Sequence, residues 1–369
     1  MKTAYSQKST VENSIAEIEA AFNGTEPKAV VFFASSRFDP HAVSREMRDA
    51  FPKASVFGCT TAGEIVSGLM LKESIVAMAL DSGVLDDILV VTIKRLDDKN
   101  CVEEAMAKFE AYYKQPVMDM DFDRYVGIVL IDGLSMAEEW LIDKIGDLTN
   151  VTFIGGSAGD DLQFKMTHLF AEGEAHRGAA VLALLKMKTG FDIIKTQSFH
   201  PIGKVLKATK VNEDKREVLE FNGKPAATAY AEARGVSVAE APGHFMHSPV
   251  GLMMGQEPYV RSPQQIQDGS MIFYCKVNEG MELSVLESTD IIDDTRKAVE
   301  AKILELGDVC GIINFHCILR TLELEDKGQI ESYGKIFSDI PTIGFSTYGE
   351  QYIGHVNQTS TMLILRKRP

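Results

Sequence analysis

Two short segments of the chain carry residue types that could bind a small polar ligand. They occupy residues 58–64 and 344–350, and both read Gly-x-Ser/Thr-Thr-x-Gly-Glu. Glycines permit positive φ angles and close backbone approach, hydroxyls can donate hydrogen bonds, and carboxylates can accept them. The alternative is a tight turn whose glutamate caps a neighbouring element. The candidate ligand contacts are Thr60, Thr61, Glu64, Ser346, Thr347 and Glu350.

These segments belong to an internal repeat. Aligned without a gap, the first two copies also match Gly68 with Gly354 and Ser74 with Ser360, and a third, shorter copy covers residues 153–160. Each copy follows an apolar strand, an amphipathic stretch and a second short strand. The three units expected are 30–34, 40–50 and 55–57; 126–131, 136–145 and 151–154; and 310–315, 327–337 and 342–343.

Apolar strands joined by an amphipathic stretch are typical of βαβ crossovers in a covered sheet. We therefore expect an α/β (or α+β) fold with repeated strand–helix–strand units around mixed sheets and two lobes. In such sheets ligands bind at the carboxyl ends of the strands, which is where the Gly-x-Ser/Thr-Thr segments lie.

The chain divides into three parts by pattern. Residues 1–27 form a polar segment with a helix, 28–188 a first domain and 189–369 a second domain. The second domain opens with consecutive strands, and Asn222-Gly223 is a hairpin signal. A short helix is expected over 225–234, since proline suits a first helical turn and Gly235 a helix end.

The C-terminal half contains two further arginines and a strand with polar residues on one face. Arg261 and Arg320 are flanked by apolar residues, and we expect Arg320 to end a strand that starts at Gly311. An arginine at a strand end can clamp a carboxylate or phosphate. Strand alternation places Asn314 and His316 on the face of Arg320. The alternatives are an ion-paired surface arginine and a hydrogen-bonded core histidine.

Composition excludes several classes of function. The net charge of −15 argues against nucleic acid and against an anionic membrane surface as partners. No apolar run is long enough for a membrane insertion, and the N-terminus lacks the apolar core of a signal peptide. The five cysteines are widely spaced, which is typical of reduced thiols. We expect a cytoplasmic protein.

Several blocks of the sequence resemble the FIST family. Phe57–Ile65 and Ile154–Asp161 are similar to two signatures of the FIST N-terminal domain. Blocks similar to the FIST C-terminal domain are Pro201–Tyr230, Val260-Arg261, Asp268–Ser270, Phe315–Arg320 and Gly344–Glu350. The resemblance covers roughly residues 28–367, so the first domain is expected to be FIST N-terminal and the second FIST C-terminal.

The resemblance implies a sensory protein that binds a small ligand. No output domain is evident, so the chain resembles free-standing members, some of which bind haem, sense nitric oxide and act on a separate histidine kinase. If haem b binds here, we expect its iron ligand to be His316, then His355, then His247. On this hypothesis Asn314 would orient the imidazole and Arg320 would pair a propionate.

Two other hypotheses stay open. A metal-free receptor for an amino acid or another small anion would use Arg261, Arg320, Glu350 and the hydroxyls of the repeat. A thiol-dependent enzyme would use Cys59, although the repeat has Phe345 at the matching position. A Soret band in the purified protein would separate the haem hypothesis from these two.

Overall fold

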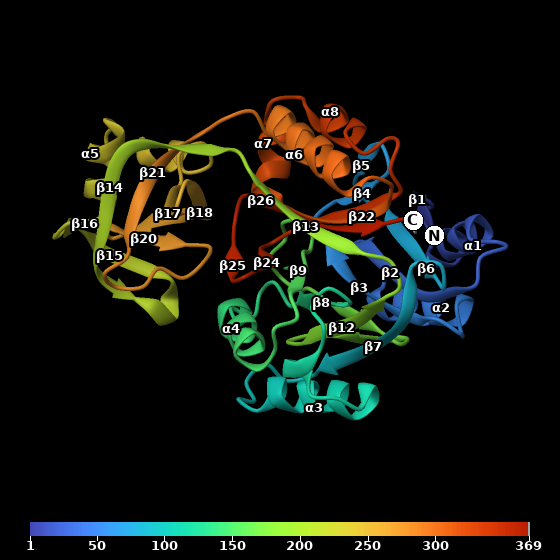
Figure 1. Cartoon of the computed structure of the whole chain (residues 1–369). Helices are drawn as coiled ribbons and strands as arrows, with labels where there is room; N and C mark the ends of the chain where they lie inside the picture. The colour runs from blue at the N-terminus through green and yellow to red at the C-terminus, as the bar shows by residue number, and fades with distance from the viewer. Residues whose placement is uncertain (368–369) are drawn as a thin grey trace. The chain divides into compact units, whose positions relative to one another are not determined.

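The computed structural model of the chain describes residues 1–367 (Figure 1). It contains two compact units, which are described separately. Unit 1 comprises Met1–Lys195, Arg296–Gly354 and the residues from Ser360 onward, and unit 2 comprises Thr196–Thr295 and His355–Thr359. The chain thus leaves unit 1 twice, at residues 196 and 355, and returns to it each time, whereas the sequence predicts a single boundary between residues 188 and 189. The mixed α/β fold class is confirmed.

Unit 1 repeats one order of elements three times: strand, helix, strand, helix, strand, hairpin, strand. The first repeat is β1 (Lys2–Ser6), α1 (Val11–Ala21), β2 (Pro27–Ser35), α2 (Pro40–Ala50), β3 (Ser55–Thr61), β4 (Glu64–Val66), β5 (Leu69–Leu71) and β6 (Ile75–Asp81). The second is β7 (Leu85–Ile93), α3 (Cys101–Tyr113), β8 (Tyr125–Ile131), α4 (Glu138–Leu148), β9 (Phe153–Ser157), β10 (Leu169–Ala171), β11 (Glu174–His176) and β12 (Ala180–Met187).

The third repeat is interrupted by most of unit 2. It consists of β13 (Phe191–Gln197), α6 (Ile291–Leu306), β22 (Val309–Cys317), α7 (Ile318–Asp326), α8 (Ile330–Lys335), β23 (Thr342–Thr347), β24 (Glu350–Tyr352) and β26 (Thr359–Arg366). The short strand β25 (His355–Val356), between β24 and β26, belongs to unit 2. In every repeat the two central strands pair in parallel, β2 with β3, β8 with β9 and β22 with β23. This confirms the expected βαβ crossovers.

The repeats exchange their hairpins. Strand β4 of the first repeat pairs with β23 of the third, β24 of the third pairs with β9 of the second, and β10 of the second pairs with β3 of the first. The resulting sheets have the orders β1-β6-β2-β3-β10-β11, β24-β9-β8-β12-β7 and β13-β26-β22-β23-β4-β5. Each sheet therefore contains a hairpin from another repeat. The exchange is cyclic, because every repeat gives one hairpin and receives one.

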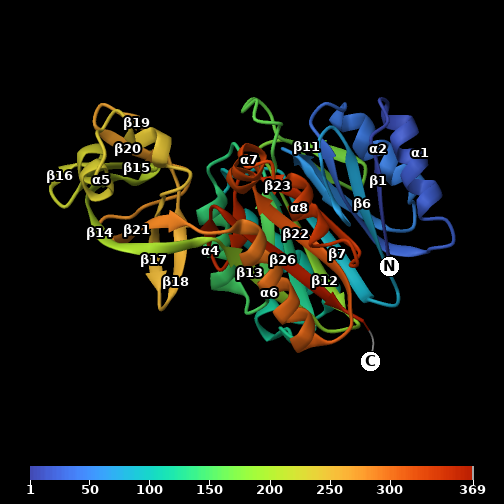
Figure 2. The same ribbon diagram turned by 90° about the horizontal axis from the view of Figure 1, so that it is seen from above.

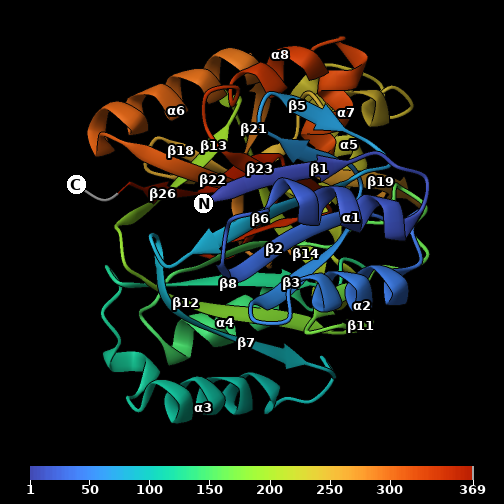
Figure 3. The same ribbon diagram turned by 90° about the vertical axis from the view of Figure 1, so that its right-hand side faces the viewer.

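The three sheets enclose one apolar core. Phe33 of the first sheet lies with its ring centroid 4.5 Å from that of Phe345 in the third, and Phe315 lies 6.0 Å from Phe345. Ile128 and Leu130 of the second sheet join the same cluster. Helices cover the outer faces: α1 and α2 the first sheet, α3 and α4 the second, and α6 to α8 the third (Figures 2 and 3).

Local sequence explains where these helices begin. The side chain of Asp39 accepts from the backbone N–H of Ala42 at 2.7 Å, and Pro40 occupies the first turn of α2. Val43 and Met47, one helical turn apart, are fully buried against the first sheet. The helix expected over 40–50 is therefore confirmed residue for residue.

Two expectations for the third repeat are wrong. Strand β22 ends at Cys317, and Arg320 lies in the first turn of α7 rather than at a strand end. The sequence from Ile318 is rich in Leu, Arg and Glu, which favour a helix. The amphipathic stretch expected over 327–337 contains α8, but α7 precedes it and is not expected from the sequence. Register also pairs Ala34 with Ile75 and His316 with Ser360, so Ser360 corresponds to Ile75 and not to Ser74.

Unit 2 is mainly an antiparallel sheet with the order β18-β17-β21-β14-β15-β20-β19, and β16 added on β15. Its strands are β14 (Phe199–Asn212), β15 (Glu217–Phe221), β16 (Lys224–Pro225), β17 (Val250–Met254), β18 (Glu257–Arg261), β19 (Pro263–Gln267), β20 (Ser270–Phe273) and β21 (Glu282–Ser288). Asn222 and Gly223 both have positive φ, as the hairpin signal predicts. Helix α5 (Ala226–Arg234) ends at Gly235 with φ 73°.

Candidate functional site

The three Gly-x-Ser/Thr segments of unit 1 form a closed ring of backbone hydrogen bonds. Ser346 N–H donates to the Gly63 carbonyl at 2.8 Å, Tyr348 N–H to the Ser157 carbonyl at 3.1 Å, and Gly159 N–H to the Thr60 carbonyl at 3.0 Å. Each segment therefore contacts both others at the carboxyl ends of the parallel strands. This is the place where ligands bind in open α/β sheets, although here it is also the junction of the repeats.

The first glycine of each segment is required by the neighbouring strand. A Cβ at Gly58 would lie 1.7 Å from the Phe32 carbonyl oxygen, and one at Gly155 would lie 1.7 Å from that of Val129. At Gly344 the corresponding distance, to the Asn314 oxygen, is 2.2 Å. These glycines lie inside β3, β9 and β23, so they serve the close pairing of the parallel strands.

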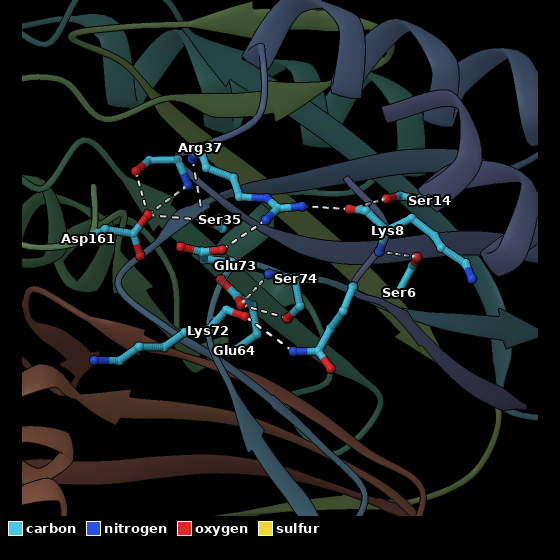
Figure 4. Close-up of polar contacts among 12 residues, drawn as sticks. Ser6, Lys8, Ser14, Ser35, Arg37, Glu64, Lys72, Glu73, Ser74 and Asp161 are labelled. Carbon is cyan, nitrogen blue, oxygen red and sulfur yellow. Dashed lines mark hydrogen bonds and ion pairs between the residues drawn. The ribbon is translucent and has the colours of Figure 1, made fainter. Parts of the chain in front are cut away.

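The hydroxyls and carboxylates of the segments largely bind one another. Glu64 accepts from the hydroxyl of Thr61, and its other oxygen accepts from Ser74 N–H at 3.1 Å and Ser74 Oγ at 2.6 Å (Figure 4). Burial raises the pKa of Glu64 to about 7, against the lowering effect of these hydrogen bonds. Glu350 accepts from Thr347 Oγ1 at 2.9 Å.

Thr60 is also engaged, since its Oγ1 accepts from His168 N–H at 2.9 Å. The contacts of Thr60, Thr61 and Glu64 match the alternative reading of the sequence, in which a glutamate braces a tight turn.

Asp160 and Asp161, at the end of the copy that covers residues 153–160, extend this network, and they are not among the ligand contacts expected from the sequence. Asp161 accepts from Ser35 Oγ at 3.0 Å and Ser36 Oγ at 2.6 Å (Figure 4). Asp160 accepts from three consecutive backbone N–H groups, those of residues 164, 165 and 166. The only sequence signal was the Asp-Asp pair that follows Gly159.

A different kind of site lies on the outer face of the third sheet. At equivalent positions of the outer faces, the first repeat has Phe32 and Ala34 and the second has Val129 and Ile131, but the third has Asn314 and His316. We call Asn314, His316, Arg320, Tyr333 and Ser360 the third-repeat polar cluster. All five side chains are buried.

The cluster is held by side-chain hydrogen bonds. Asn314 Nδ2 donates to the Tyr333 hydroxyl at 3.2 Å, Ser360 Oγ donates to Asn314 Oδ1 at 2.7 Å, and the two hydroxyls of Tyr333 and Ser360 lie 3.2 Å apart. Arg320 also hydrogen-bonds the Tyr333 hydroxyl, and burial raises the pKa of Tyr333. Nearby, the hydroxyls of Thr321 and Ser346 lie 2.8 Å apart.

His316 is the exception within the cluster. It is fully buried, and its ring centroid lies 4.4 Å from that of Tyr333. Neither of its ring nitrogens has a hydrogen-bond partner among residues 1–367. Burial and, secondarily, the charge of Arg320 lower the pKa of His316 well below its usual value. The imidazole is therefore neutral, with one donor and one acceptor to offer.

The structure brings Asn314, His316 and Arg320 together, as the sequence predicted, although through a helix and not along one strand. Three other candidates, Arg261, His247 and His355, belong to unit 2. There Arg261 Nη1 donates to the carbonyl of Val260 at 3.2 Å. Among the described residues, no group of three or more His, Cys, Asp or Glu is arranged to hold a metal ion.

Comparison with known proteins identifies the family. The FIST N domain matches residues 28–224 and the FIST C domain matches residues 226–353. The chain belongs to the FIST family. FIST domains are in general sensory domains that bind small ligands in signalling proteins.

Among individual proteins, the FIST chain is 24% identical over 281 residues to an uncharacterized protein of Methanocaldococcus jannaschii, covering 69% of this chain and 52% of that protein. It thus spans about half the length of the curated relative it matches. A crystal structure of cyanuric acid hydrolase from A. caulinodans aligns with 76% of this chain and 99% of that one, at 10% identity and a TM-score of 0.20, from which nothing follows. Within residues 1–367 of this FIST protein, no helix has the length and apolarity needed to cross a membrane.

Proposed function

We propose that this FIST protein is a receptor for a small anionic ligand and that the third-repeat polar cluster binds the anionic group. The observation that carries the proposal is the burial of Arg320 beside the unpartnered imidazole of His316, which occupies a strand position where the other two repeats have Ala34 and Ile131. The first two repeats build the same outer face from apolar side chains.

The cost of this arrangement supports a functional role. A buried polar group without a hydrogen bond costs about 1–3 kcal/mol, and a buried charge costs more. His316 is such a group, and Arg320 is only 1% exposed. Strained or unsatisfied groups of this kind cluster at binding sites, because a ligand can supply the missing partners.

The chemistry of the cluster suits a carboxylate with a neighbouring donor. A guanidinium pairs a carboxylate through two parallel hydrogen bonds, and a neutral imidazole can accept from an ammonium or hydroxyl group. An amino acid or another small organic anion meets both demands. Since Arg320 and His316 are buried, entry of the ligand requires movement of the residues that cover them, and that movement is a means of signalling to a separate protein.

The experiment is calorimetric titration of the full chain with the twenty amino acids and with small mono- and dicarboxylates. Arg320→Lys keeps the charge but loses the planar fork, so we expect affinity to fall roughly 10- to 150-fold, the equivalent of about 1.5–3 kcal/mol for a charge-assisted hydrogen bond. Arg45→Ala, which removes a 61% exposed arginine side chain on α2, is the matched control and should leave affinity unchanged. Equal affinities in Arg320→Lys and the unmodified protein would refute the proposal.

Haem b binding and nitric oxide sensing remain predictions for the same protein, with His316, His355 and His247 as ligands and a separate histidine kinase as partner. The fit of His316 is poor, because its ring is fully buried and lies against Tyr333. An absorption spectrum decides: a Soret band that shifts with nitric oxide and is lost in His316→Ala, His355→Ala or His247→Ala would assign the ligand.

The thiol-enzyme alternative has little support. Cys59 is fully buried, and burial raises the pKa of its thiol well above the usual value, which disfavours the nucleophilic thiolate.

A further inference from the structure

The second repeat carries a loop that the fold does not need. Between β9 and β10 the chain has residues 158–168, whereas the equivalent connections in the other repeats are residues 62–63 and 348–349. Two residues therefore suffice to lead from the parallel strand into the exchanged hairpin. The additional length in the second repeat calls for another explanation.

The loop exposes large apolar side chains. Leu162, Phe164 and Met166 are 36%, 53% and 42% exposed. In the neighbouring loop after β8, Leu134 and Met136 are 38% and 52% exposed. We call these five residues the apolar loop pair.

The two loops of the pair are fixed to each other. The carboxylate of Asp132 accepts from Leu134 N–H at 3.0 Å and from Thr167 Oγ1 at 2.6 Å, so it joins the start of one loop to the end of the other. The ring of Phe164 stacks on Tyr348 with centroids 5.0 Å apart. The bases of the two loops are therefore joined through Asp132, and the ring of Phe164 is supported by Tyr348.

The backbone of the pair is strained. Met136, Leu162 and Phe164 all have positive φ, between 52° and 63°, which is uncommon for bulky residues. The carboxylate of Asp160 holds this conformation by accepting from the backbone N–H groups of residues 164 to 166. Strain of this kind persists where it prepares a surface for binding.

We propose that the apolar loop pair is the docking surface for a separate signalling protein, and that the docking segment of that protein presents apolar anchors flanked by basic residues. The negative net charge of the chain favours a basic partner. A chain of net charge −15 is repelled by an anionic bilayer and by a second copy of itself, but it attracts a basic partner. Methionine side chains such as those of Met136 and Met166 offer an adaptable surface for apolar anchors.

The test uses two synthetic amphipathic helices of eighteen residues, which share a leucine face and carry either lysines or glutamates on the other face. Fluorescence anisotropy with the full chain at physiological salt should show binding of the lysine peptide and at least tenfold weaker binding of the glutamate peptide. Phe164→Ser and Met136→Ser should each weaken binding of the lysine peptide about tenfold, as truncation of an interface anchor does.

The control variant is Leu304→Ser, which removes an 85% exposed leucine from α6 and should not change binding. Met136→Ser tests the surface without touching the stack on Tyr348. Absence of binding up to millimolar peptide, or equal losses in Leu304→Ser and Phe164→Ser, would overturn the proposal. So would binding to anionic vesicles or a dimer in sedimentation that Phe164→Ser abolishes. No small ligand is present in the assay, so its outcome is independent of the Arg320 test.

Discussion

At the scale of single residues, the repeats act as controls for one another. A residue type that recurs at the same position in all three serves the fold, as the glycines at 58, 155 and 344 do by letting two parallel strands approach. A residue type found in one repeat alone, such as His316 where the others have Ala34 and Ile131, serves something else. Comparison of equivalent positions in the three repeats therefore distinguishes residues that maintain the fold from residues with another role.

The close approach of β3 to β2 at Gly58 predicts a large loss of stability for Gly58→Ala. The new methyl group would overlap the Phe32 carbonyl oxygen, and since backbone cannot yield as a side chain does, we expect the free energy of unfolding to fall by about 3 kcal/mol. Gly146→Ala in α4 is the control, because nothing apart from its chain neighbours and the backbone of its own helix lies within 4 Å of its Cβ position and alanine favours a helix by about 0.5–1 kcal/mol. Urea unfolding measures both, and similar values for the two variants would disprove the steric explanation.

At the scale of elements, the sequence predicted more of the fold than of the site. Continuous apolar strands and a capped helix such as Pro40–Ala50 are local patterns, and the sequence alone predicts them. The pairing of β4 with β23 was not, because a three-residue strand carries no signal that names a partner from another repeat. The end of β22 was misplaced for a similar reason: Ile318 and Leu319 fit a strand or a helix equally by pattern, and packing decides.

The sequence marks Asn314, His316 and Arg320 as candidates because of their residue types in apolar surroundings, and the structure brings the three side chains together. That they bind a ligand stays a prediction. The hydroxyls of Thr60 and Thr61 were chosen from their motif, but contacts that only the tertiary structure shows engage them within the turn.

The hydrogen bonds that Glu64 accepts from Thr61 and Ser74, which we call the turn brace, predict that the free energy of unfolding depends on pH. The folded pKa of about 7 lies above the ordinary value of 4.5, so between these values the folded state holds a proton that the unfolded state has released. Stability therefore falls as pH rises from about 4.5 to 7, by about 3 kcal/mol in total, and is level above 7. Glu64→Gln imitates the protonated acid and should remove this decline.

Urea unfolding of the unmodified protein and of Glu64→Gln between pH 5 and 8 gives the difference in slope directly. Glu73→Gln is the control, because Glu73 directly precedes Ser74 and its side chain is 71% exposed. This variant should show the same slope of unfolding free energy against pH as the unmodified protein. Parallel pH curves for the unmodified protein and Glu64→Gln would show that the brace is ionised throughout.

At the scale of the whole molecule, hairpin exchange distinguishes this chain from a stack of repeats. In a solenoid each repeat contacts only its neighbours in sequence, and stability is roughly a sum of local terms. Here the first repeat completes the sheet of the third, the third that of the second, and the second that of the first. The three sheets also share one central core, so no repeat of unit 1 has a complete sheet or an inner sheet face covered by its own residues alone, although the helices of the first and second repeats pack on the outer faces in clusters of their own.

This closure predicts that damage to one repeat is felt equally in all three. Phe345 is fully buried in the shared core and packs against Phe33 and Phe315, so Phe345→Ala should cost about 3–5 kcal/mol. Hydrogen exchange followed by mass spectrometry should then show the same loss of protection in β2, β8 and β22, because these strands open only when unit 1 unfolds as a whole. A loss confined to β22 and β23 would mean that the third repeat opens alone, and that the exchanged hairpins do not couple the sheets. Leu304→Ser, which changes only an exposed side chain of the same repeat, should leave protection in all three strands unchanged.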